Sequence, residues 1–156
     1  MKAVQITTGT ACHLDAAMVH DALHDFPLGD IDILFIENVG NLVCPADFDI
    51  GQHLDVVLLS VTEGDDKPDK YPVIFRAADL VLITKTDLLP HIEEFDLARA
   101  RRSIERVRGG GAIEEVSVKT MSGIRTWTGW LAANLDTVRR PAGALSSGPE
   151  TGEKRR

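Results

Sequence analysis

Two cysteines and one histidine near the start of the chain carry side chains that bind transition metals. Cys12 and His13 are adjacent, and Cys44 follows 32 positions after Cys12. Thiolate and imidazole ligands suit zinc, copper or nickel. Three ligands do not close a tetrahedral structural zinc site, so the site would be open, completed by water or shared across a twofold dimer contact. Each of these arrangements suits metal transfer better than permanent storage.

The same residues also allow a purely structural interpretation. Free cysteines are often small buried side chains, and His13 would then cap a helix that begins at Leu14. His20 and His24 have helical spacing, but they stand among acidic residues, which favours a solvated polar face over a metal site.

A second group of polar residues follows an apolar run in the middle of the chain. Thr84-Lys85-Thr86-Asp87 has the form of the guanine-reading motif of GTPases, usually Asn-Lys-x-Asp. The carboxylate of Asp87 only accepts hydrogen bonds, so it can pair with both the ring N–H and the exocyclic amine of guanine, whereas adenine presents an acceptor at the ring position. Ser117-Val118-Lys119 follows the next apolar run, where GTPases use a loop to contact the base oxygen.

A structural interpretation of this motif also remains open. Lys85 and Asp87 would equally end a strand and begin a turn, because a four-residue match is short. Thr84 departs from the usual Asn, whose side chain normally binds neighbouring loops.

Both groups need a scaffold that positions their loops. Five apolar runs predict buried strands, at residues 3–7, 31–37, 54–61, 80–85 and 113–118. Segments with a helical period separate them, which predicts an α/β fold with a mostly parallel sheet and helices on both faces. Ligands bind beyond the carboxyl ends of the strands in such a sheet. We therefore expect the polar and metal-capable residues after the five runs to gather at one edge.

The helical period predicts one long helix at residues 93–108. Glu93 and Glu94 favour its positive start, and Gly109-Gly110-Gly111 stops it. Further helices are predicted at residues 14–25, 71–78 and 123–138. Residues 140–156 have too little apolar content to repay ordering and are predicted to be a disordered tail.

Composition excludes several classes of partner. With 156 residues, of which 44% are hydrophobic, the chain is expected to form one domain. A net charge of -7 would repel a phosphate backbone, so nucleic acid is not expected as a partner. No apolar stretch approaches the roughly 18 residues that span a bilayer. Two cysteines and no export signal predict a reduced, cytoplasmic setting.

Several segments are similar to the signature motifs of the hydrogenase nickel-incorporation GTPases, the HypB family. They are residues 8–16 (TGTACHLDA), 36–45 (IENVGNLVCP), 60–68 (SVTEGDDKP), and 70–72 (KYP) leading to 75–80 (FRAADL). The likeness covers about residues 3–135, in order and without large gaps. It implies a P-loop GTPase-like fold of the metallochaperone branch. Urease GTPases are close relatives, but the loop ending in Val43-Cys44-Pro45 favours the hydrogenase type.

The resemblance also implies roles for individual residues. Glu37 replaces the Asp of the common Asp-x-x-Gly switch motif, and Gly40 offers its N–H to the terminal phosphate of GTP. Magnesium would accompany GTP in a complete form. Cys12, His13 and Cys44 would bind nickel or zinc at a nucleotide-dependent dimer interface. The implied partners are a second copy of the chain, the hydrogenase large subunit and other nickel-delivery maturation proteins.

The sequence departs from this family at the phosphate site. It contains no Gly-x-x-x-x-Gly-Lys-Ser/Thr, the loop whose N–H groups and lysine hold the phosphates. Residues 1–139 are therefore predicted to be an incomplete GTPase domain with metal-binding segments, missing the P-loop strand and helix, and hydrolysis is not expected of this chain alone. A misplaced start, a truncated gene or a split protein would each explain the departure.

Two functional hypotheses remain open at this point. The first is an incompletely represented nickel metallochaperone GTPase, whose full form couples GTP hydrolysis to metal hand-over. The alternative is a non-enzymatic nickel- or zinc-binding or interaction module that has lost nucleotide hydrolysis. An unstable fragment without function is a third possibility.

Overall fold

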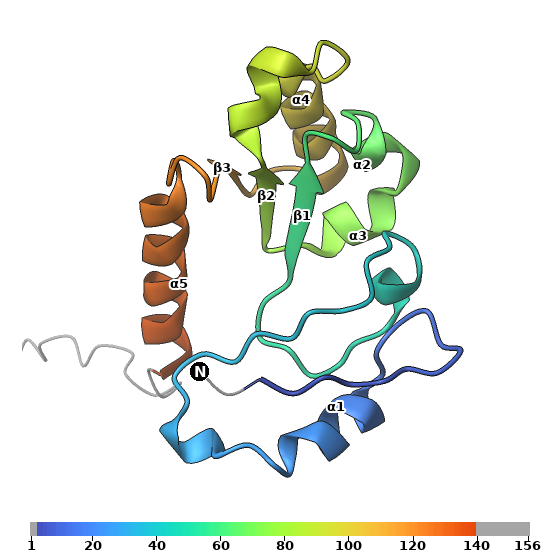
Figure 1. Ribbon diagram of the computed structural model, residues 1–156, viewed down its shortest axis with the longest axis vertical. Coiled ribbons are helices and arrows are strands. Elements are labelled where there is room, and N and C mark those ends of the chain that lie inside the picture. The colour runs from blue at the N-terminus through green and yellow to red at the C-terminus, as the bar shows by residue number, and fades with distance from the viewer. Residues whose placement is uncertain (1–2, 140–156) are drawn as a thin grey trace, which may run out of the picture.

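A small parallel sheet lies at the centre of the part of the chain that the computed structural model describes, residues 3–139 (Figure 1). Its strands are β1 (Val56–Ser60), β2 (Leu80–Thr84) and β3 (Ala112–Val116), in the order β1-β2-β3. Both pairings are parallel, with Val57 opposite Val81 and Val81 opposite Ile113. The strands predicted at residues 54–61, 80–85 and 113–118 are confirmed, with ends that differ by a few residues.

Helices cover both faces of this sheet, because successive side chains of a strand point to opposite sides. On one face, Leu59 and Ile83 pack with the fully buried Phe75 of α3 (Pro72–Ala77) and Ile104 of α4 (Leu97–Arg108). The other face packs against α5 (Ile124–Arg139), through the residues Leu80, Leu82, Val116, Trp127 and Trp130. The predicted α/β fold with helices on both faces is confirmed.

The remaining helices are short. They are α1 (Ala16–Leu23), α2 (Lys67–Lys70) and the 3-10 segments Leu28–Asp30, Cys44–Asp47 and Thr86–His91. The predicted start of the long helix at Glu93 and Glu94 is wrong. The carboxylate of Asp96 accepts a hydrogen bond from the backbone N–H of Arg99 at 2.9 Å, so α4 begins at Leu97. It ends where predicted, at Gly109, whose φ of 72° suits glycine.

Two of the five predicted strands, residues 3–7 and 31–37, are wrong. Neither segment is a strand, and both run below the sheet in Figure 1. A strand needs a neighbour that satisfies its backbone N–H and C=O groups, and among residues 3–139 these segments join no ladder. Three of their apolar side chains are accordingly exposed, Val4 at 46%, Ile33 at 38% and Phe35 at 64%.

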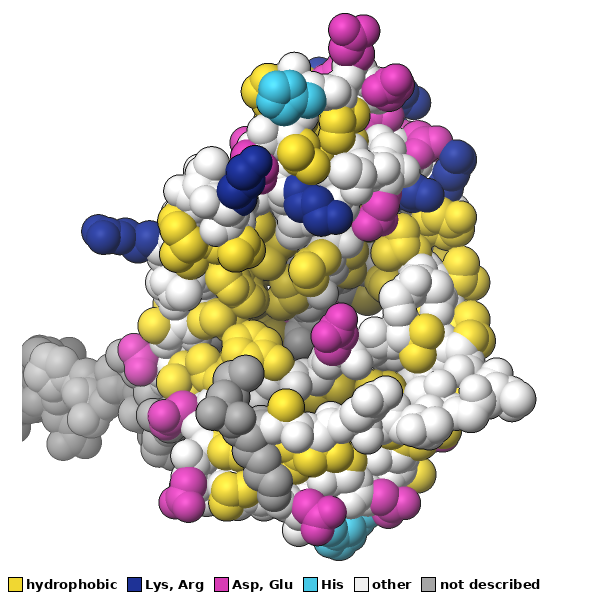
Figure 2. Space-filling view, viewed as in Figure 1, with side chains coloured by type: hydrophobic (Ala, Val, Ile, Leu, Met, Phe, Trp, Pro, Cys, Tyr) yellow, Lys and Arg dark blue, Asp and Glu magenta, His cyan; other side chains and the backbone are white. Residues whose placement is uncertain are grey.

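One face of β1 is partly uncovered. Leu58 is 58% exposed, because α5 covers the strands β2 and β3 on this face but not the middle of β1. Figure 2 shows apolar side chains gathered over the middle of the face that it presents. Within the described range, no helix is long and apolar enough to cross a membrane. The tail predicted at residues 140–156 lies outside the described residues.

Candidate functional site

Two loops that are distant in sequence meet at the predicted metal ligands. The side-chain amide of Asn41 donates to the backbone carbonyl of Cys12 at 2.8 Å. The carbonyl oxygen of the same side chain accepts from the backbone N–H groups of Val43, at 3.0 Å, and Cys44, at 2.8 Å. A second asparagine, Asn38, uses its carbonyl oxygen in the same way. Sequence reasoning did not single out either asparagine, although both lie inside the quoted segment 36–45.

Asn38 binds the first loop just beyond the metal-capable residues. Its Oδ1 accepts from the backbone N–H of Leu14 at 2.9 Å and from that of Val39 at 2.8 Å. Leu14 is buried, which anchors the loop. The helix α1 that follows is capped by Asp15, whose Oδ1 accepts from the backbone N–H of Met18 at 2.8 Å. The alternative in which His13 caps this helix is therefore wrong.

The side chain of Cys12 affects the ionisation of the Cys44 thiol. The hydrogen bond from Cys12 is the main cause that raises the pKa of the Cys44 thiol, and desolvation adds to it. Cys12 is exposed and Cys44 is half-buried, so the interpretation of both as buried core side chains is wrong. The Sγ of Cys12 lies 3.8 Å from Nδ1 of His13, whose ring stacks on Phe48 with centroids 3.6 Å apart.

The donors present here, two sulfurs and one imidazole, are of the kinds that thiophilic divalent cations prefer. The three side chains are not arranged around a single point. Among residues 3–139, no three His, Cys, Asp or Glu side chains are placed to hold one metal ion. The stacking of His13 on Phe48 fixes the imidazole beside the thiols. His20 on α1 and His24 directly after it are both exposed, as the polar-face interpretation predicted.

The predicted switch residues lie between the two asparagines. Glu37 is exposed and immediately precedes Asn38, while Gly40 is exposed and precedes Asn41. A Cβ added at Gly40 would meet nothing within 4 Å. The segment 37–40 is thus open on its outer side and tied to the metal loop at both ends.

The predicted guanine motif lies at the carboxyl end of β2. Lys85 has a left-handed backbone, with φ at 59°, and turns the chain into the 3-10 segment Thr86–His91. Asp87 faces the end of β3, where the buried hydroxyl of Ser117 donates to its Oδ1 at 2.5 Å. Nζ of Lys119 lies 3.9 Å from Oδ2 of Asp87. The structure therefore brings Asp87, Ser117 and Lys119 together, with Thr84 at the strand end.

A tight turn holds the Ser117 side of this group. Ser117 donates its backbone N–H to the carbonyl of Ser122 at 3.0 Å, and its hydroxyl accepts from the backbone N–H of Thr120 at 3.2 Å. Gly123 closes the turn with φ at 70°, and a Cβ there would stand 1.9 Å from the carbonyl oxygen of Glu115. Val118 lies 78% exposed at the tip, so its backbone is accessible.

The two groups do not share one edge, which corrects the prediction that all the loops would gather beyond the carboxyl ends of the strands. In Figure 1 the metal loops lie below and beside α3, whereas the carboxyl ends of β1 and β2 point to the top. Among the described residues, no hydrogen bond or ion pair joins loops 8–14 and 38–48 to loops 84–87 and 117–122. The reason is that segments 3–7 and 31–37 do not enter the sheet.

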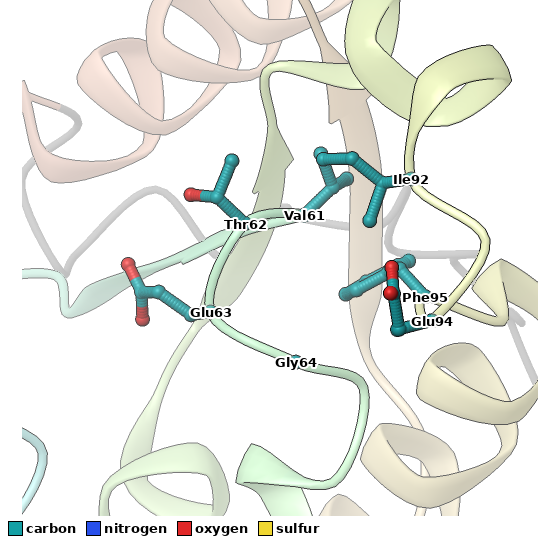
Figure 3. Close-up of a pocket in the computed structure, with 7 residues that line it drawn as sticks. All are labelled: Val61, Thr62, Glu63, Gly64, Ile92, Glu94 and Phe95. Atoms are coloured by element: carbon teal, nitrogen blue, oxygen red, sulfur yellow. The ribbon is translucent and has the colours of Figure 1, made fainter.

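A third loop at the carboxyl end of β1 lines a cavity of about 290 Å³ (Figure 3). Val61, Ile92 and Phe95 supply apolar walls, and Figure 3 shows Glu63 and Glu94 on opposite sides of Gly64. The next residue, Asp65, is buried. It accepts from the backbone N–H of Asp96 at 3.1 Å and pairs with Arg99 at 3.2 Å, so it fixes this loop to the start of α4. None of the predicted site residues lines this cavity.

Several known proteins are similar to this chain in sequence. A family model described as the CobW/HypB/UreG nucleotide-binding domain matches residues 1–114. The hydrogenase maturation factor HypB of Azotobacter vinelandii is 48% identical over 153 residues, which are 93% of this chain and 50% of the relative. That of Escherichia coli K12 is 50% identical over 129 residues, 83% of this chain and 44% of the relative. The chain spans about half the length of these curated relatives.

Two solved structures of HypB proteins are also similar to this chain. HypB from Archaeoglobus fulgidus has a TM-score of 0.78 and 42% identity, over 83% of this chain and 63% of that one. HypB from Helicobacter pylori, determined in complex with nickel, has a TM-score of 0.81 and 36% identity, over 91% of this chain and 67% of that one.

Proposed function

Because this chain belongs to the CobW/HypB/UreG family of nucleotide-binding domains, we propose that it carries the metal-binding and guanine-reading segments of a nickel-delivering GTPase of hydrogenase maturation. The observation that carries the proposal is that Asn41 joins the loops of Cys12, which is exposed, and Cys44, which is half-buried. The HypB relatives are hydrogenase maturation factors, and one similar structure contains nickel.

In this proposal nickel is the cargo, and zinc competes for the same donors. Cys12 and Cys44 bind the ion through sulfur. His13 adds its imidazole when the ring leaves Phe48, and a second copy of the chain supplies further ligands in a homodimer. The cation favours the thiolate form of both cysteines, so metal binding releases protons.

Guanine recognition falls to the loops after β2 and β3. Asp87 receives the two N–H groups of the base edge, Lys85 lies along the base, and the backbone of the Ser117–Lys119 loop meets the base oxygen. Ser117 orients the Asp87 carboxylate through the bond that it donates. A carboxylate oxygen still has a second lone-pair direction free when one bond is made. Base binding therefore does not require the Ser117 bond to break.

The nucleotide-dependent part of the cycle is assigned to segment 37–40. Gly40 offers its N–H to the terminal phosphate, Glu37 acts in the switch, and magnesium accompanies GTP. The partners are the hydrogenase large subunit and other nickel-delivery maturation proteins, in the cytoplasm.

A nickel titration of the 156-residue chain tests the proposed metal site. Nickel binding is followed by the sulfur-to-nickel charge-transfer absorbance, in wild type and in the double variant Cys12→Ser with Cys44→Ser. His53→Ala, which changes an exposed imidazole elsewhere, is the control. Loss of the absorbance in the double variant alone supports the proposal, and unchanged nickel affinity in that variant contradicts it.

Guanine recognition is measured separately. A fluorescent guanosine diphosphate is displaced by unlabelled GDP or ADP, in wild type and Asp87→Ala. The proposal expects GDP to compete far better than ADP in wild type, and expects Asp87→Ala to abolish this preference. Equal competition by the two nucleotides in wild type contradicts the guanine assignment.

A second candidate function is a metal-binding or interaction module without nucleotide hydrolysis. It concerns the 156 residues alone, which contain no Gly-x-x-x-x-Gly-Lys-Ser/Thr and span about half the length of the curated relatives. GTP turnover by the chain separates the two candidates. Nickel binding with no phosphate release supports the second, and measurable phosphate release excludes it.

A further inference from the structure

The carboxamide of Asn41 bonds to backbone on both sides of the thiol pair. Its nitrogen donates to the carbonyl of Cys12, and its oxygen accepts from the N–H groups of Val43 and Cys44. These three contacts are 2.8 to 3.0 Å long. One planar group therefore spans the gap between two chain segments that are 29 residues apart.

Few other polar contacts hold these two segments together. Residues 3–7 and 31–37 form no ladder, so the sheet does not set their spacing. Besides the Asn41 contact, one hydrogen bond joins the two loops among residues 3–139, from the backbone N–H of Leu14 to Oδ1 of Asn38, and it lies beyond His13. The ring of His13 also stacks on Phe48 of the second loop. Asn41 is therefore the side chain whose hydrogen bonds reach the backbone of both Cys12 and Cys44.

From these contacts we infer that Asn41 is a positioning residue of the metal site, whose carboxamide sets the separation of the Cys12 and Cys44 thiols for a thiophilic divalent cation. The inference rests on the proposed function in one respect, that the thiol pair binds such a cation. Asn41 itself is not a ligand in this account. It acts through the backbone on either side of the pair.

The chemistry of the site explains why this residue is an asparagine. The position needs a donor toward the Cys12 carbonyl and an acceptor toward two N–H groups, and a carboxamide supplies both in one plane. A carboxylate has no donor and would face the Cys12 carbonyl with a negative charge. The carboxamide is also neutral, so it adds no charge beside two thiols that must ionise when the metal binds.

The test compares Asn41→Ala with a matched control in the 156-residue chain. Asn134→Ala removes another half-buried carboxamide, whose Nδ2 donates to the carbonyl of Trp130 at 2.8 Å within α5. Nickel chloride is titrated into each protein and followed by the charge-transfer absorbance. Loss of a group that orients metal ligands typically weakens binding about 10- to 100-fold. We expect a loss in that range for Asn41→Ala, and wild-type affinity for Asn134→Ala.

A second measurement needs no metal. The rate at which diamide oxidises Cys12 and Cys44 to an internal disulfide, followed by intact mass, reports how often the two thiols meet. We expect this rate to fall in Asn41→Ala, since the carboxamide no longer joins the two loops. Asn41→Asp keeps the acceptor oxygen but loses the donor, and we expect it to slow the reaction as well. Thermal melts confirm that each variant is folded, and Asn41→Asp decides the question if Asn41→Ala does not fold.

The outcomes separate this inference from the proposed function. If wild type binds nickel through its cysteines and Asn41→Ala binds it equally well, the positioning role is overturned while the function stands. If wild type binds no nickel but Asn41→Ala slows the disulfide reaction, the positioning role stands while the nickel function fails. Unchanged disulfide rates in both Asn41 variants overturn the positioning role.

Discussion

At the scale of single residues, the buried hydroxyl of Ser117 makes two hydrogen bonds that matter for both stability and the guanine loop. Its side chain is 1% exposed, donates to Asp87 and accepts from the backbone N–H of Thr120. A buried hydroxyl with two partners is costly to remove, because each partner loses a bond that water does not replace. The same bond fixes the orientation of the carboxylate that we propose reads guanine.

Replacing Ser117 with alanine should therefore lower the free energy of unfolding by about 1–3 kcal/mol. Urea unfolding at pH 7 measures the change. Ser122→Ala, at an exposed position in the same turn, is the control and should change stability by less than about 0.5 kcal/mol. Equal effects of the two variants would show that the Ser117 hydroxyl contributes no more than an exposed one.

At the scale of elements, β1 has one covered face and one open face. Leu59 is fully buried against α3 and α4, whereas its neighbour Leu58 is 58% exposed on the side that α5 does not reach. The two residues are chemically identical and differ only in the face on which they lie. They therefore form a matched pair for measuring what burial contributes in this strand.

Leu59→Ala should lower the free energy of unfolding by about 2–5 kcal/mol, because it leaves a cavity in the core. Leu58→Ala should change it by no more than about 0.5 kcal/mol. Both are measured by urea unfolding of the full chain. Comparable losses at the two positions would mean that the open face of β1 is covered in solution.

The elements α2 and α4 are joined by a surface ion pair. Oδ1 of Asp69 accepts from Nη2 of Arg106 at 2.6 Å, and Oδ2 accepts from the hydroxyl of Ser103 at 3.1 Å. The Arg106 bond is the main cause that lowers the pKa of Asp69 from its ordinary value of 3.8, and the Ser103 bond adds to it. A pKa that is lower in the folded state stabilises the fold above the unfolded value, and this contribution disappears as the pH falls through the folded value.

Asp69→Asn should therefore flatten the loss of stability with acid below about pH 4, because asparagine does not ionise. The measurement is the midpoint of urea unfolding as a function of pH between about 2 and 6. Asp136→Asn, on the exposed side of α5, controls for the loss of one carboxylate. A wild-type slope in Asp69→Asn would show that the ion pair with Arg106 does not persist in solution.

At the scale of the whole molecule, the metal loops and the guanine loops are separate. The first lie beside α3 and the second at the carboxyl ends of β2 and β3 (Figure 1). Sites that share no partners usually contribute independently to binding and stability. In this chain, the two proposed functions should therefore be separable by mutation.

Asp87→Ala should leave the nickel affinity of the chain within about twofold of wild type, because the two sites share no contact. Cys12→Ser with Cys44→Ser should likewise leave the guanosine diphosphate affinity unchanged. Each affinity is measured as described above, in all three proteins. A change in one affinity caused by mutation of the other site would show energetic coupling between them in this chain.

The sequence alone determined the elements with strong local patterns. Continuous apolar runs located β1, β2 and β3, and an apolar stripe located α4 and α5, because burial on one face or on both leaves a period that can be read along the chain. Long motifs also determined the family, which the comparisons confirm. The same logic failed at residues 3–7 and 31–37, where an apolar run was present but no neighbouring strand paired with it.

Only the tertiary structure decided how the candidate sites are assembled. It placed Ser117 against Asp87, stacked His13 on Phe48, and joined the Cys12 and Cys44 loops through Asn41. The physical reason is that hydrogen bonds between distant segments depend on the path of the chain, which leaves no local period in the sequence. The residues that could do chemistry were therefore visible from their types, while the side chains that hold them in place were not.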